Sequence, residues 1–237
     1  MGALEKTGFA DLCFNQRLPK FAAQIAKAYS HRVTSAEAVP DAVTVYHDVL
    51  TKQPDYSVAI VMVGYLTNLK NLLQSPGGAD LVGNKVTRWI CMGGTFIGYP
   101  PKDDLKLRNV NFQRDTASAL FVIHHSPDEV VFAGREVCSV PSGLQIGAQF
   151  AATPADNPVR RAYEHYFGGK AKNRQVADHL TILYSVRGLT SCWDLPESGR
   201  MNLQENMTIK MAARHQWKTA PSIEEVAQRP PCRGCAG

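Results

Sequence analysis

The hydrophobic positions in the first third of the chain alternate between helical spacing and unbroken apolar runs. Phe21, Ile25 and Tyr29 lie four residues apart, which predicts a helix in this region. A second amphipathic pattern, over residues 39–50, predicts a helix that ends near residue 52. Residues 57–64 are apolar with little interruption, which is typical of a β-strand covered on both faces.

The same alternation continues as far as Gly134. Leucines predict a helix over residues 66–73, and the turn at residues 75–78 ends it. Residues 86–92 form a second apolar strand, residues 116–125 form a helix with Asp115 at its N-cap, and residues 130–132 form a third short strand. Strands separated by helices need crossover connections. The pattern therefore predicts the α/β class, with a Rossmann-like, mainly parallel sheet covered by helices.

The later part of the chain has a more helical pattern. Asn157 followed by Pro158 is a typical helix start, and residues 178–186 form a predicted helix that Gly188 closes. Ser222 with Glu225 has the spacing of a capping box. No change of composition marks a domain boundary, so we expect a single domain over residues 1–227 and a flexible tail over residues 228–237.

Composition and charge exclude several classes of protein. The 237 residues are 44% hydrophobic and 20% charged, which are values of a globular protein. The net charge is +5, but the excess is spread along the chain, so we expect no nucleic-acid partner. No apolar run reaches the roughly 18 residues of a membrane span, so we expect no membrane partner. Six cysteines in a chain of this length, without a signal peptide, favour reduced thiols and a cytoplasmic location.

The predicted strands end in glycine-containing turns. Val63 and Gly64 end the first strand, residues 92–94 the second and residues 133–136 the third. Ligands of open α/β sheets bind beyond the carboxyl ends of the strands. These glycines are consistent with backbone that approaches a ligand, but composition alone favours ordinary tight turns.

Three segments at these turns form a recognisable set. Residues 58–69 read VAIVMVGYLTNL, residues 91–94 read CMGG and residues 109–115 read NVNFQRD. In this order they resemble the inosine-uridine preferring nucleoside hydrolases, which pair a Gly-x-Leu-Thr-Asn-Leu helix start with a Met-Gly-Gly turn and a Glu-Phe-Asn…Asp segment. Residues 177–188 resemble a later family segment, Trp-Asp-Gln-Thr-Ala-Val-Leu, so that the match is best over residues 42–188.

The resemblance implies an enzyme of ribonucleoside catabolism. Family members are glycosidases that hydrolyse the N-glycosidic bond of a ribonucleoside to ribose and base. Calcium binds the ribose hydroxyls and a water, and an aspartate takes the proton of that water. The resemblance therefore implies calcium as cofactor, a small ribonucleoside as substrate and a possible homo-oligomer.

The resemblance also assigns roles to individual residues. The Val63 carbonyl and the Asp178 carboxylate match metal ligands. The positions that match or line the sugar site are Met92, Asn109, Asn111 and Glu136, and Glu136 has the alternative of an ion pair with Arg135. Asn68, in the Leu-Thr-Asn signature, matches a residue expected to hold the turn.

Departures from the family pattern concern the metal and the catalytic base. The family's Asp-x-Asp-x-x-x-Asp-Asp motif is absent, so the catalytic residues are unknown, and we expect the N-terminal strand-helix unit to be missing. Asp103–Asp104 has a different spacing, Asn109 replaces a Glu, and Ala177 replaces a His or Trp.

Calcium takes about six to eight oxygen ligands, which Asp178 and one carbonyl cannot supply. Three hypotheses follow. The chain is a fragment of a hydrolase, or a non-catalytic binding or scaffold paralogue, or a protein whose Asp cluster comes from another subunit.

Overall fold

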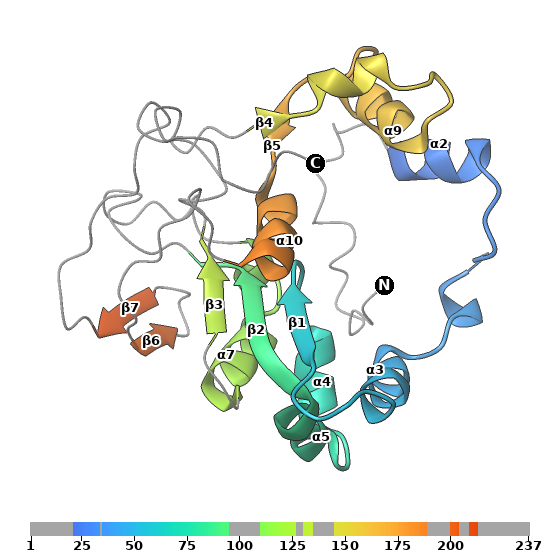
Figure 1. The fold of residues 1–237 in the computed structure, drawn as a ribbon. Coiled ribbons are helices and arrows are strands. Elements are labelled where there is room, and N and C mark those ends of the chain that lie inside the picture. The colour runs from blue at the N-terminus through green and yellow to red at the C-terminus, as the bar shows by residue number, and fades with distance from the viewer. Residues whose placement is uncertain are drawn as a thin grey trace.

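A parallel three-stranded sheet lies at the centre of the protein. The computed structural model describes residues 21–33, 35–94, 110–126, 130–134, 145–188, 200–203 and 209–212. The strands are β1 (Val58–Met62), β2 (Val86–Met92) and β3 (Val130–Ala133), paired in the order β1-β2-β3 (Figure 1). Both pairs are parallel, which confirms the predicted α/β architecture.

Some of the other described elements pack on this sheet, and others, such as α2 with α9 and β6 with β7, pack against each other. The α-helices are α2 (Phe21–Ala28), α3 (Ala42–Thr51), α4 (Thr67–Gln74), α5 (Gly78–Lys85), α6 (Val110–Gln113), α7 (Thr116–His125), α9 (Pro158–Phe167) and α10 (Ala177–Arg187). The 3-10 helices are η1 (Ala36–Ala38) and η3 (Ala148–Ala152). The remaining strands are β4 (Gln145–Ile146), β5 (Arg174–Gln175), β6 (Arg200–Leu203) and β7 (Ile209–Ala212). None of these helices is long and apolar enough to cross a membrane.

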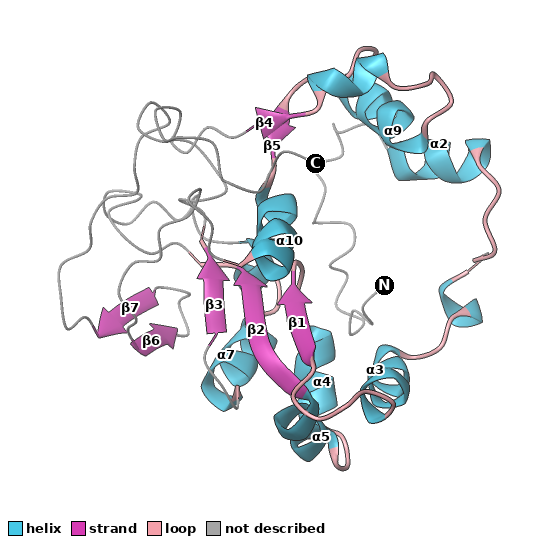
Figure 2. Cartoon of the chain, viewed as in Figure 1, coloured by secondary structure: helices cyan, strands magenta, loops and turns pink. Residues whose placement is uncertain are grey.

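One face of the sheet carries the hydrophobic core. Trp89 and Cys91 of β2 pack with Ile60 and Met62 of β1 and with buried side chains of α3, α4, α5 and α7. Ile90 is also fully buried, and because neighbouring strand residues point to opposite faces, its side chain lies on the other side of the sheet. Helix α10 covers that side, opposite to α4 and α7, and contacts all three strands (Figure 2).

The expectation that β1 is covered on both faces is only partly correct. Ile60 and Met62 are buried, whereas Val61 is half-buried and Ala59 is exposed. The described helix on that face, α10, leaves Ala59 uncovered. The unbroken apolar run therefore predicts the strand correctly but overstates its burial.

Helix caps follow the sequence closely. Asp41 accepts hydrogen bonds from two amides of the first turn of α3, and Asn157 does the same for α9. Asp115 caps α7 as predicted. Helix α5, in contrast, is not predicted, because the glycines at its start indicate only a turn. It begins at Gly78, directly after Gly77, which has a φ of 72°.

The later part of the chain contains short strands in addition to the helices that its sequence pattern predicts. Helices α9 and α10 are confirmed, but β4 pairs with β5 and β6 pairs with β7, both antiparallel. Helix α2 packs against α9 across a long sequence separation, where the Phe21 and Tyr166 rings meet edge to face. The predicted capping box at residues 222–225 and the tail at residues 228–237 lie outside the described residues.

Candidate functional site

The carboxyl ends of the three parallel strands lie side by side. Met62 is in register with Cys91, and Met92 with Ala133. The Gly93 amide donates a hydrogen bond to the Ala133 carbonyl at 3.2 Å, which extends the pairing into the turn after β2. The described residues of the three turns, which include Ala133 and Gly134 of the third, therefore meet at one end of the sheet, where ligands of this class of fold bind.

Close packing explains one of the glycines in these turns. A Cβ atom on Gly93 would lie 2.3 Å from Cζ of Phe112, whose ring is buried in the core. The next glycine, Gly94, has a φ of 87°, which a residue with a side chain rarely adopts. For Gly93, tight packing is thus sufficient without a ligand. Gly64 differs, since a Cβ atom there would have no neighbour within 4 Å.

Two of the predicted sugar-binding residues are in direct contact. Asn111, in α6, donates a hydrogen bond from Nδ2 to the Met92 carbonyl at 3.0 Å, and the same nitrogen lies 3.4 Å from the Met92 Sδ. Both residues are half-buried. Helix α6 thus places the Asn111 amide group at the end of β2. The sugar-binding roles that the resemblance implies for the two residues stay predictions.

Asp115 connects the helices that follow β1 and precede β3. One carboxylate oxygen, Oδ1, accepts a hydrogen bond from the Ser118 amide at 3.1 Å, which is the cap of α7. The other, Oδ2, accepts a hydrogen bond from the hydroxyl of Thr67, the first residue of α4. Asn68 was expected to hold this turn, but the hydrogen bond that the structure shows across it comes from Thr67. The sequence gives no signal for this pair, because its members lie 48 residues apart.

The electrostatics of Asp115 favour its ionised form. Partial burial raises the pKa of this carboxyl, but the hydrogen bonds from Ser118 and Thr67, together with the positive charge of Lys70, outweigh that effect. The net pKa is therefore below the ordinary value of an aspartate. Asp115 is an ionised, hydrogen-bonded structural group, and both of its oxygens are engaged by the protein.

The pKa of Asp178, in the first turn of α10, shifts in the opposite direction to that of Asp115. The residue is exposed overall, yet the protein around its carboxyl group removes enough water that desolvation raises its pKa. The positive charges of His179 and Arg174 oppose this shift without cancelling it. A bound cation would reverse the shift, since it would favour the carboxylate form. The pKa of Asp178 is thus compatible with a metal ligand but does not require one.

The described residues do not by themselves fit a calcium ion. Val63 is 37% exposed, so its end of β1 is open to solvent. The Val63 carbonyl and the Asp178 carboxylate supply at most three oxygens, fewer than the about six to eight that calcium takes. Within the described ranges, no three His, Cys, Asp or Glu side chains are grouped so that they could hold a metal. The two predicted ligands stay predictions.

The remaining candidates lie outside the described residues. These are the sugar-site positions Asn109 and Glu136, the alternative ion-pair partner Arg135, and the Asp103–Asp104 pair. Of the six candidate site residues, the structure therefore places Val63, Met92, Asn111 and Asp178. It brings Met92 and Asn111 together.

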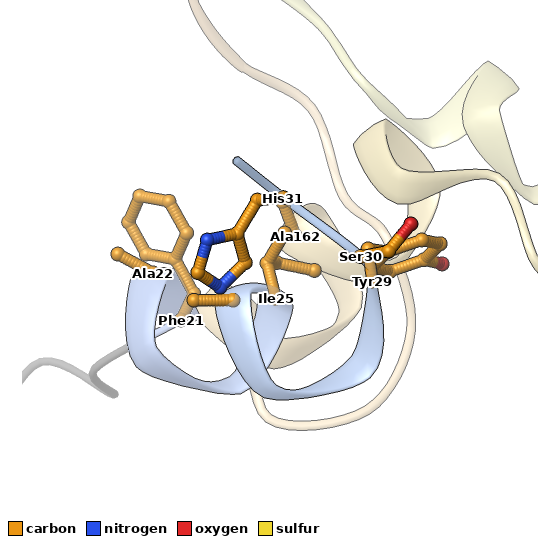
Figure 3. Close-up of a pocket in the computed structure, with 8 residues that line it drawn as sticks. Phe21, Ala22, Ile25, Tyr29, Ser30, His31 and Ala162 are labelled. Carbon is orange, nitrogen blue, oxygen red and sulfur yellow. The ribbon is translucent and has the colours of Figure 1, made fainter. Parts of the chain in front are cut away.

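A shallow cavity of about 380 Å³ lies in another part of the chain, between α2 and α9 (Figure 3). Its walls are mainly apolar and include Phe21, Ile25, Tyr29 and Ala162. The Tyr29 hydroxyl donates a hydrogen bond to the Asp156 carbonyl at 2.6 Å, which fixes the end of α2 beside α9. None of the candidate site residues lines this cavity. Its polar lining residues are Tyr29, Ser30 and His31, of which Tyr29 hydrogen-bonds to the Asp156 carbonyl and the His31 ring to the Val33 carbonyl.

The sequence matches no protein-family model and no curated protein. Among solved structures, the chain is similar to a plant nucleoside hydrolase, the PpNRh1 enzyme, with a TM-score of 0.52 and 16% sequence identity. The similarity covers 81% of this chain and 61% of that chain. The protein therefore has a nucleoside hydrolase-like α/β fold and corresponds to less than two thirds of the length of that enzyme.

Proposed function

We propose that this chain is a nucleoside hydrolase-like protein that binds a ribonucleoside at the carboxyl edge of its sheet. The observation that supports this most directly is the hydrogen bond between Asn111 and the Met92 carbonyl, which joins two candidate sugar-binding residues. They lie at the edge of an α/β sheet where ligands bind, in a fold similar to that of a nucleoside hydrolase. An amide side chain can both donate hydrogen bonds to sugar hydroxyls and accept them.

The activity that fits this fold is hydrolysis of the N-glycosidic bond, giving ribose and a free base. That reaction needs a group that takes a proton from water, and negative charge near a sugar that becomes cationic in the transition state. Both oxygens of Asp115 are occupied by hydrogen bonds within the protein. Desolvation raises the pKa of Asp178, which makes its carboxylate a stronger proton acceptor, but the described acidic side chains form no cluster that could activate a water through a metal. The described residues therefore support binding of the sugar more directly than activation of water. The preference for inosine and uridine stays a prediction.

A second candidate function is a binding or scaffold protein that keeps the fold without the reaction. It is favoured by the observation that acidic side chains of the described segments form no cluster able to hold a metal. Both functions predict that a ribonucleoside binds at the carboxyl edge of the sheet. They differ in whether the base is released.

The test is to measure binding and hydrolysis with the same preparation of the full chain. Binding of inosine, uridine and ribose is measured by calorimetry, and release of hypoxanthine or uracil by chromatography, each with and without calcium. Binding with release supports the hydrolase, and binding without release supports the non-catalytic paralogue. If none of the three compounds binds, the proposed function is wrong.

Variants connect the binding to the proposed site. Asn111→Ala removes the amide beside Met92 and is expected to weaken inosine binding. Asn84→Ala is the matched control, because Asn84 is exposed and lies in α5, before β2 and thus toward the opposite edge of the sheet. Equal effects of the two substitutions would place the binding site elsewhere.

A further inference from the structure

Asn111 and Asp115 connect the ends of two different strands. Asn111, in α6, reaches back to the Met92 carbonyl at the end of β2. Asp115, four residues later, reaches Thr67, in the first turn after β1. Residues 111–115 thus connect the ends of both strands. The position of Asn111 therefore depends on what holds Asp115, at the other end of this segment.

Thr67 is well placed to hold that end. It is only 6% exposed, and Leu66 before it is 1% exposed, so the start of α4 is fixed by the core. The buried Thr67 hydroxyl has the Asp115 carboxylate as its hydrogen-bond acceptor. A hydrogen bond to a charged group in a half-buried setting is stronger than one between neutral groups. The segment that carries Asn111 is therefore hydrogen-bonded to the buried start of α4.

We infer that Thr67 and Asp115 form a positioning pair for the candidate sugar site: their hydrogen bond holds Asn111 against Met92. Neither residue is assigned a contact with the ligand. The part of this inference that concerns ligand binding rests on the proposed function, whereas the placement of Asn111 and Met92 does not.

The two oxygens of Asp115 allow the positioning role to be separated from the capping role. Oδ1 caps α7, and Oδ2 accepts from Thr67. Asp115→Ser keeps an effective N-cap but provides one side-chain oxygen on a shorter side chain, so it cannot serve both partners. Thr67→Val removes the hydroxyl with little change of shape and leaves the cap intact.

Two further variants serve as the rescue and the control. Thr67→Ser keeps the hydroxyl and is expected to match the wild-type protein in both resonances and in inosine affinity. Thr116→Val removes a half-buried hydroxyl next to Asp115 that is directed at the Gln113 carbonyl instead. Any effect common to Thr67→Val and Thr116→Val therefore comes from the loss of a hydroxyl in general.

The experiment follows the side-chain amide resonance of Asn111 and the methyl resonance of Met92 by NMR, in the full chain. It also measures inosine affinity by calorimetry. Thr67→Val and Asp115→Ser are expected to shift both resonances and to weaken inosine binding about tenfold, the lower end of what is typical for residues that orient metal ligands. Thr67→Ser and Thr116→Val are expected to leave the resonances and the affinity unchanged.

Two outcomes separate this inference from the proposed function. If Thr67→Val and Asp115→Ser lower the melting temperature but leave the Asn111 and Met92 resonances in place, the pair is only a structural tie and the positioning role is refuted. If the unchanged protein binds neither inosine nor ribose, the proposed function fails. In that case, the Asn111 and Met92 resonances of the variants still test whether the pair positions Asn111.

Discussion

The Asp115 side chain stabilises both a local feature, the start of α7, and a long-range contact with Thr67. Hydrogen bonds from Ser118 and Thr67 and the charge of Lys70 lower its pKa in the folded protein, although its partial burial acts in the opposite direction. Because the folded pKa lies below the unfolded value, ionised Asp115 stabilises the protein above the unfolded pKa of about 3.9. That contribution is lost as the pH falls through the folded pKa.

The pH dependence of an Asp115→Ala variant should reflect this. At pH 7 the substitution removes a helix cap and the partner of a buried hydroxyl, so the free energy of unfolding should fall by about 1–2 kcal/mol. The difference from the unchanged protein should narrow toward pH 3. Urea unfolding at both pH values measures it, with Asp48→Ala, an exposed aspartate in α3, as the control. A difference that widens at low pH would contradict the lowered pKa.

Gly93 is a second residue at which a small change should have a large effect. A Cβ atom there would overlap the Phe112 ring, which is 2% exposed and packed in the core. Gly93→Ala should therefore lower the free energy of unfolding by about 1–3 kcal/mol, as is usual for overpacked positions. It should also displace the neighbouring Asn111. Denaturant unfolding measures the first effect, and an unchanged midpoint would show that the ring can move aside without cost.

At the level of elements, local signals explain which parts were predictable. The bounds of β2 and α7 agree with the sequence pattern, since an apolar run and the Asp115 cap are local features. Helix α5 was missed because its glycines weaken the helical pattern, although Val82 is fully buried and Asp80 lies in its first turn. Strands β6 and β7 are also absent from the sequence-based prediction, although residues 200–203 and 209–211 alternate between polar and apolar.

The glycines of α5 give a paired prediction for this element. Gly83 has helical backbone, and a Cβ atom there would meet nothing within 4 Å, so Gly83→Ala should stabilise the protein by about 0.5–1 kcal/mol. Gly78→Ala should destabilise it, because a Cβ atom at Gly78 would lie 1.8 Å from the Leu72 carbonyl oxygen. Thermal melts of the two variants measure both signs. A loss of stability on Gly83→Ala would be incompatible with this packing of α5.

At the scale of the whole molecule, the parallel, helix-covered sheet was predictable, whereas the contacts that build the site were not. Parallel crossovers follow from the succession of strands and helices along the chain. The contacts of Asn111 with Met92 and of Thr67 with Asp115 span 19 and 48 residues, and no pattern in one sequence shows such pairs. Resemblance indicated the first pair by assigning both residues to the sugar site. Only the structure reveals the second.

The similarity to a nucleoside hydrolase raises the question of whether this chain binds calcium. A ligand that binds only the folded state raises stability by RT ln(1 + [L]/Kd). The described oxygens that could contribute, at Val63 and Asp178, are too few for a calcium site. If only these described oxygens are available, calcium at millimolar concentration should leave the melting temperature unchanged, whereas inosine should raise it with or without the metal.

Thermal melts in calcium, in a chelator and in inosine test this, with Asp178→Asn measured alongside. If calcium raises the melting temperature and Asp178→Asn abolishes the rise, residues beyond the described segments complete a metal site around that carboxylate. Desolvation already raises the pKa of Asp178, and a calcium ion beside it would lower that pKa again. Calcium binding that involves Asp178 should then strengthen as the pH rises through the pKa of this group, which distinguishes it from binding elsewhere on the surface.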